Sequence, residues 1–106
     1  MALMSDCALR DALEERFTDE SEVRDVARYG CISGVSGFIT RMECCAFFDK
    51  HQEEIEQWLL DEHDFTLCSF CENAGDVDGL KNAMVWAAVD LYCQERTIYN
   101  ETFQPA

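Results

Sequence analysis

The chain has 106 residues, which is the size of one small domain and leaves no room for a second hydrophobic core. Its 22 acidic and 8 basic residues give a formal net charge of −14, while 48% of the residues are hydrophobic, so an intrinsically disordered chain is excluded. The same charge argues against binding to duplex nucleic acid or to an anionic membrane, because both need Lys and Arg. We expect one folded acidic domain over residues 1–106, with a loose tail from about residue 99.

Glycine and proline are scarce, with five Gly and one Pro, so long helices are expected. Ser5 can cap a first helix that runs to about Phe17. Leu9, Leu13 and Phe17 recur at helical spacing and form one apolar stripe, which we expect to face the core.

A second helix is predicted to start after Asp19 or Ser21 and to end at Tyr29, because Gly30 is a typical terminating residue. Three of the five glycines lie in residues 30–37, where small residues allow turns and close backbone approach. This segment is predicted to be the principal irregular loop.

One or two helices are expected between Phe38 and Glu62, with acidic residues opposite an apolar side. That apolar side consists of Ile55, Trp58, Leu59 and Leu60. Thr66 can cap a further short helix that ends near Gly75.

The last helix is predicted over residues 79–98, with Asp76 or Asp78 as its cap. Its expected core stripe is Leu80, Met84, Ala87 and Leu91, widened by Ala83, Trp86, Ala88 and Val89. The pattern as a whole predicts an all-α fold, a compact bundle of about five helices with a glycine-rich loop after the second helix.

The negative charge is concentrated in residues 43–78, which hold eleven acids and one base, Lys50, for a net charge of −10. One interpretation is a surface that binds a strongly basic partner, with carboxylates in place of phosphates. The alternative is a solvated helix face that keeps the protein soluble. The residues expected to contact the partner are Glu53, Glu54, Glu56, Asp61, Glu62 and Asp64.

A smaller basic feature lies in the first half of the chain. Arg24 and Arg28 stand four residues apart, and Arg41 follows the glycine-rich segment, with Tyr29 and Phe38 nearby in sequence. Arginines beside aromatic rings can bind unpaired bases, so this patch is an alternative site for single-stranded nucleic acid. The competing interpretation is that the arginines form ion pairs with nearby acids, Glu20, Glu22 or Asp25.

The cysteines and histidines are the candidates for metal binding or catalysis. Cys68 and Cys71 have the spacing of zinc ligands, but the second pair of a structural zinc site is missing, so packed thiols are favoured. His51 and His63 lie in acidic polar stretches, where exposure is expected. We therefore expect no catalytic residue, no metal site and no cofactor.

Two segments, VARYGCISGVSGFI at residues 26–39 and FFDKHQEEI at residues 47–55, resemble a small uncharacterised domain of phage and mobile-element proteins. The late segment KNAMVWAAV at residues 81–89 resembles the one that closes that fold, and the likeness covers roughly residues 23–92. The resemblance implies a phage accessory protein with a helical fold and supplies no catalytic residues. In size and charge the chain is similar to anti-CRISPR proteins, particularly inhibitors of type I surveillance complexes.

The leading hypothesis is a non-enzymatic, phage-encoded inhibitor whose acidic surface engages a basic DNA channel of a type I CRISPR surveillance complex. Another basic protein could be the partner instead. One alternative is single-stranded nucleic acid bound by the arginines; another is an acidic adaptor or dimer module with an exposed aromatic patch around Phe47 and Phe48. The start of the chain has no basic, apolar leader and no stretch suits a bilayer, so the host cytoplasm is expected.

Overall fold

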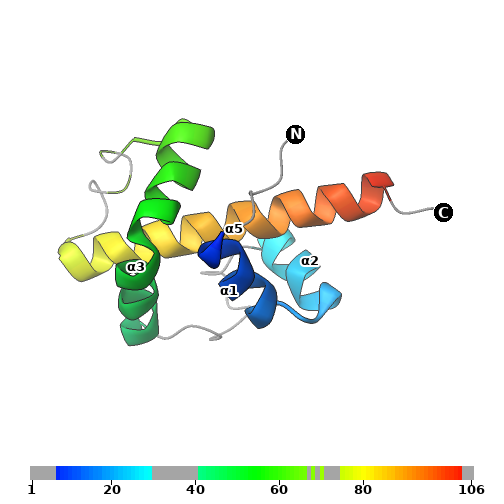
Figure 1. The fold of residues 1–106 in the computed structure, drawn as a ribbon, viewed down its shortest axis with the longest axis horizontal. Helices are drawn as coiled ribbons and strands as arrows, with labels where there is room; N and C mark the ends of the chain where they lie inside the picture. Colours follow the sequence, from blue (N-terminus) through cyan, green and yellow to red (C-terminus); the bar gives the residue numbers. More distant parts are fainter. Residues whose placement is uncertain (1–6, 30–40, 67, 69, 71–74, 104–106) are drawn as a thin grey trace. The chain divides into compact units, whose positions relative to one another are not determined.

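A computed structural model of the chain describes residues 7–29, 41–66, 68, 70 and 75–103, with the side chains of residues 41 and 99–103 excluded. All regular structure within these residues is helical, which confirms the predicted all-α class (Figure 1). The elements are α1 (Ala8–Arg16), α2 (Glu20–Tyr29), α3 (Arg41–Glu56), the π-helix η2 (Gln57–Glu62) and α5 (Val77–Phe103). The described residues thus contain four α-helices, and a count of about five is not confirmed. The predicted glycine-rich loop lies outside the described residues.

The chain divides into two units. Unit 1 comprises Met1–Ser36 and Val89–Ala106, and unit 2 comprises Gly37–Ala88. Helix α5 therefore contributes residues 77–88 to unit 2 and residues 89–103 to unit 1. The single domain expected over residues 1–106 stays a prediction.

In unit 1, α1 begins at Ala8 with Cys7 as its N-cap, so the predicted cap at Ser5 is wrong. The Cys7 thiol accepts a hydrogen bond from the backbone N–H of Arg10 at 3.4 Å. This bond satisfies one of the backbone donors that a helix start leaves without an intrahelical partner. The predicted apolar stripe of this helix is confirmed, because three side chains are fully buried: Leu9, Leu13 and Phe17.

Helix α2 starts immediately after Asp19, one of the two predicted positions, and ends at Tyr29 as predicted. The Asp19 carboxylate accepts a hydrogen bond from the backbone N–H of Ser21 at 2.9 Å, which fixes the start of the helix. Val23 and Val26 are buried, so the apolar side of α2 faces the core of unit 1.

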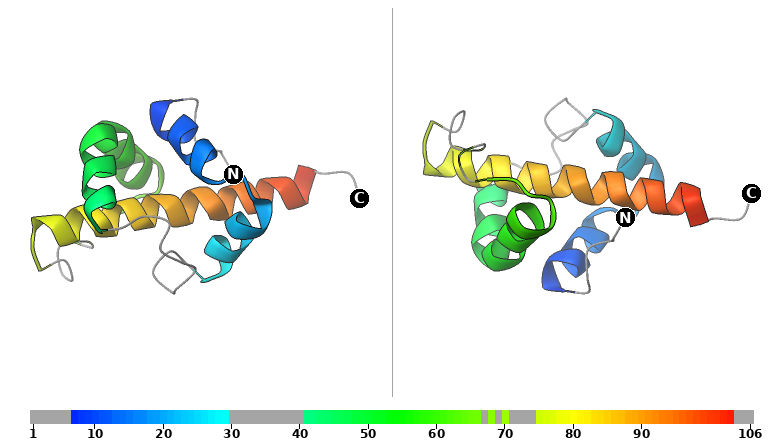
Figure 2. Two further views of the ribbon diagram at one scale, coloured as in Figure 1. Left: turned by 90° about the horizontal axis from the view of Figure 1, so that it is seen from below. Right: turned by 90° about the horizontal axis from the view of Figure 1, so that it is seen from above.

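One guanidinium group connects the joint between α1 and α2 to the C-terminal part of α5. Arg96 donates hydrogen bonds to the carbonyl oxygen of Phe17 and to the hydroxyl of Tyr92, both at 3.0 Å, and forms an ion pair with Glu20. In the two views of Figure 2, α1 and α2 lie on different sides of this part of α5. Arg96 therefore links all three helical segments of unit 1.

In unit 2, α3 is interrupted at His51, whose φ of −121° and ψ of 23° are not helical, and η2 continues directly from its end. Phe47 and Phe48 are buried, at 9% and 6% exposure. The exposed aromatic patch expected at these two residues is therefore wrong, because both rings belong to the core. Ile55 and Leu59 are fully buried further along the same segment.

The start of α5 is held against α3 by side chains of both helices. The Asp76 carboxylate accepts a hydrogen bond from the backbone N–H of Gly79 at 2.6 Å, which confirms Asp76 as the cap. Lys81 pairs with Asp49 of α3 at 2.7 Å. These contacts fix the beginning of the helix and its attachment within unit 2.

The core stripe of α5 differs from the predicted one. Its buried members are Met84, Val85, Ala88, Val89, Tyr92 and Cys93. Of the predicted stripe, Met84, Ala88 and Val89 are buried, whereas the other members are only half-buried: Leu80, Ala83, Trp86, Ala87 and Leu91. The helix extends to Phe103 rather than residue 98, because the sequence holds no helix breaker before Pro105. None of the described helices is both long and apolar enough to cross a membrane.

Candidate functional site

The six acidic residues singled out from the sequence lie on the end of α3, on η2 and just after it. We call them the acidic surface: Glu53, Glu54, Glu56, Asp61, Glu62 and Asp64. Four of them are exposed, and Glu54 and Glu56 are half-buried. The same segment buries Ile55, Trp58 and Leu59 of the predicted apolar side, whereas Leu60 is half-buried, so the predicted separation of acids and apolar residues is confirmed only in part.

The backbone after η2 fixes the end of the acidic surface. Asp64 has a φ of 57°, in the left-handed region that Asp tolerates better than most residues. The next residue, Phe65, donates its backbone N–H to the carbonyl oxygen of Leu59 at 3.0 Å. The Phe65 ring lies 5.5 Å from that of Phe70. Asp64, the last residue of the acidic surface, therefore lies in a turn of defined geometry.

The exposed carboxylates of the acidic surface carry uncompensated charge. Within the described part of the chain, no cation pairs with Glu53, Asp61, Glu62 or Asp64. Lys81 is engaged by Asp49, whose hydrogen bond raises the pKa of the Lys81 ammonium group. Like charges that are crowded and unpaired repel one another, so a cationic partner would be attracted to this segment.

His51 is buried, at 5% exposure, so its expected exposure is wrong. Its ring lies 4.7 Å from that of Phe47, one helical turn earlier, and Ile55 follows one turn later. Apolar residues four positions before and after His51 indicate that its side chain is buried. The polar residues directly beside it in the sequence hide this pattern. Burial lowers the pKa of His51 below its ordinary value of 6.5, although Glu54 opposes this shift.

This burial predicts a pH-dependent contribution to stability. Because the unfolded chain protonates His51 more readily than the folded chain, the contribution is complete above the unfolded pKa and is lost as the pH falls through the folded pKa. We compare the chain with its His51→Gln variant by urea unfolding. The difference between their free energies of unfolding should shrink from about pH 7.5 to about pH 5.5. A difference that stays constant over this range would contradict the prediction.

The described cysteines differ in exposure: Cys44 and Cys93 are buried, Cys7 and Cys45 are half-buried, and Cys68 is exposed. Cys44 and Cys93 are fully buried and pack as small apolar side chains, and burial raises the pKa of Cys93 to about 12. Cys68 is exposed, so its predicted packing is wrong, and Cys71 lies outside the described residues. Among the residues that the structure describes, no three His, Cys, Asp or Glu side chains are grouped to hold a metal ion.

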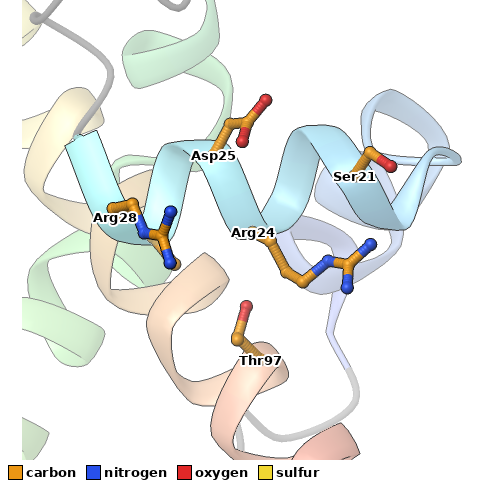
Figure 3. A pocket seen from close by; sticks show the side chains of 6 residues that line it. Ser21, Arg24, Asp25, Arg28 and Thr97 are labelled. Atoms are coloured by element: carbon orange, nitrogen blue, oxygen red, sulfur yellow. The ribbon is translucent and has the colours of Figure 1, made fainter.

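A hollow of about 520 Å³ lies in unit 1, beside α2 and the C-terminal part of α5 (Figure 3). It is lined by Ser21, Arg24, Asp25, Ala27, Arg28 and Thr97. Arg24 and Arg28, two of the three arginines of the alternative nucleic-acid patch, therefore line the same hollow. The side chain of the third, Arg41, lies outside the described residues.

The ion pairs considered for these arginines do not form within the described residues. Glu20 pairs with Arg96 instead, and neither Arg24 nor Arg28 has an ion pair there. The Arg28 guanidinium carbon lies 5.9 Å from the centroid of the exposed Tyr29 ring. Both arginines are exposed, so their charges are available to a ligand.

Taken together, the described residues define an all-helical domain with a strongly acidic segment and a small basic hollow. The chain belongs to the family described as a domain of unknown function (DUF7222), whose model matches residues 4–103. No curated protein and no solved structure matches it.

Proposed function

We propose that this domain is a non-enzymatic inhibitor that binds the basic nucleic-acid channel of a host defence complex through its acidic surface. The partner that we propose is a type I CRISPR surveillance complex in the cytoplasm of a bacterial host, with the inhibitor encoded by a phage. Such a complex holds DNA in a channel lined with Lys and Arg. Carboxylates that occupy this channel would exclude the DNA.

The observation that supports the proposal is the uncompensated charge of the acidic surface. Glu53, Asp61 and Glu62 are exposed beside a buried apolar stripe, so the backbone that carries them is held by the core of unit 2. A charged surface on a packed helix loses little conformational freedom on binding. Complementary charges also accelerate association and select the partner.

The proposal is tested by reversing two exposed charges with Glu53→Lys and Asp61→Lys in one variant. Binding to a purified type I surveillance complex is measured by biolayer interferometry, with and without prebound target DNA. We expect the unmodified chain to bind only the DNA-free complex. The double variant should bind at least about 100-fold more weakly, since loss of a close charge pair costs several kcal/mol at an interface.

The matched control is Asp11→Lys with Glu15→Lys, which reverses two exposed acids of α1 and changes the net charge by the same amount. It should bind within about threefold of the unmodified chain, because charges outside the contact act mainly through screened, long-range attraction. An equal loss of affinity in both variants would show that binding depends on net charge alone. Undiminished binding of the test variant, or no binding of the unmodified chain, would exclude the proposal.

The alternatives predict other results. Single-stranded nucleic acid bound through Arg24, Arg28 and Arg41 would give association only after target DNA has been opened. An acidic adaptor or dimer module would give self-association or binding to another basic protein in the absence of any complex. Light scattering coupled to size-exclusion chromatography distinguishes these outcomes by mass.

A further inference from the structure

The hollow of unit 1 has no part in the proposed function. It is formed by one side of α2 and by Thr97 of α5, and all of its lining residues belong to unit 1. Figure 3 shows Arg24 and Arg28 extending from the side of α2 that faces Thr97. The Thr97 hydroxyl points toward α2, between the two guanidinium groups in this view.

The two arginines are unusual in so acidic a chain. With 22 acidic residues against 8 basic ones, most cations are expected to find a carboxylate. Arg10, Lys81 and Arg96 do so, with Glu14, Asp49 and Glu20 respectively. Arg24 and Arg28 have no ion pair within the described residues, although Asp25 is adjacent to Arg24 in the sequence.

Thr97 supplies a second, independent observation. Its hydroxyl oxygen is buried, and within the described residues it has no hydrogen-bond partner. A threonine in a helix can donate this hydroxyl to a carbonyl oxygen of the preceding turn. Buried polar groups are generally satisfied, so this hydroxyl lacks the acceptor that such a group usually has.

One residue of the lining, Asp25, carries a negative charge that would repel an anion. Asp25 belongs to the lining, but its carboxylate extends from the other side of α2 from Thr97 in Figure 3. Ser21, also at the hollow, can donate or accept a hydrogen bond. The part of the hollow nearest Thr97 therefore presents two positive charges and a hydroxyl donor.

We propose that this hollow binds a phosphate group, free or as the terminal group of a small ester. The planar guanidinium groups of Arg24 and Arg28 would bind its oxygens, because their paired N–H donors match phosphate geometry. The Thr97 hydroxyl would donate to a third oxygen. Two guanidinium charges neutralise a phosphate dianion.

A small ligand fits better than a nucleic-acid strand. An extended polyanion meets the field of a chain with a net charge of −14 along its whole length. A single phosphate meets mainly the charges that line the hollow, two arginines against one aspartate, since charges farther than about 8 Å are screened at physiological salt. The small size of the basic feature therefore favours one phosphate group.

Isothermal titration calorimetry tests the site with inorganic phosphate and with adenosine monophosphate as probes. Arg24→Gln with Arg28→Gln should weaken binding at least about 100-fold, because each removes a charge-assisted hydrogen bond. Thr97→Val should weaken it about three- to tenfold. The control, Lys50→Gln, removes an exposed cation of unit 2 and should change affinity less than about twofold.

The outcomes separate the ligand sources and the competing interpretation. Equal affinity for the two probes would identify free phosphate as the ligand. Tighter binding of adenosine monophosphate would identify a phosphate ester. Tighter binding of a ten-residue thymidine oligonucleotide, with a steep salt dependence, would overturn the small-ligand proposal in favour of a single strand. The proposal of a phosphate site would be wrong if neither probe binds, or if binding is retained after both arginines are replaced. The variant with Glu53→Lys and Asp61→Lys should bind phosphate normally, so this site and the proposed function fail independently.

Discussion

Replacement of Leu59 by alanine is expected to lower the free energy of unfolding by about 2–5 kcal/mol. Leu59 is fully buried in η2, and its carbonyl oxygen accepts the hydrogen bond from Phe65 that ends this segment. The smaller side chain removes buried apolar contacts and leaves a cavity that the surrounding core fills only in part. The loss should disturb the backbone that carries the acidic surface.

The neighbouring substitution, Leu60→Ala, is the matched control. Leu60 is half-buried, so the same change should cost only about 1 kcal/mol or less. Both variants are compared with the unmodified chain by urea unfolding, followed by far-ultraviolet circular dichroism. Equal losses at the two positions would contradict the packing described for η2.

Arg96→Met should lower the free energy of unfolding by about 2–3 kcal/mol. Methionine preserves much of the length of the side chain but removes the donors that bind Phe17, Tyr92 and Glu20. The carbonyl of Phe17 at the end of α1 and the carboxylate of Glu20 at the start of α2 would lose this donor. The joint between these two helices would then lose its hydrogen bonds and ion pair to Arg96, while the ring contact of Phe17 with Tyr92 would remain.

Arg24→Met provides the comparison, because Arg24 is exposed and has no ion pair within the described residues. Its cost should stay within about 0.5 kcal/mol, as expected for a surface substitution. Urea unfolding at two salt concentrations measures both variants. A cost for Arg96→Met no larger than that for Arg24→Met would show that the three contacts of Arg96 contribute little.

The sequence predicts helices best where one apolar side dominates. Leu9, Leu13 and Phe17 recur every four residues, and all are fully buried. Asp76 precedes a long uninterrupted segment, and its carboxylate caps α5. The acids around Glu53 could also be placed, because local periodicity alone separates them from the buried side.

The remaining errors have both local and tertiary causes. Tyr92 and Cys93 carry polar atoms and are not part of the predicted stripe, yet both are buried in α5. His51 stands among polar neighbours in the sequence, but the helical period brings it beside Phe47. Arg24 and Arg28 have nearby acids in sequence, but Glu20 pairs with Arg96, 76 residues away. Competition of this kind for a carboxylate is decided by packing and leaves no local sequence pattern.

The division of the chain into two units also divides its chromophores. Both tryptophans, Trp58 and Trp86, belong to unit 2, whereas all three tyrosines belong to unit 1: Tyr29, Tyr92 and Tyr99. Indole emission therefore reports on one unit, and derivative absorbance of the phenol rings reports on the other. A single denaturant titration follows both units without any label, and coincident midpoints identify one cooperative folding transition.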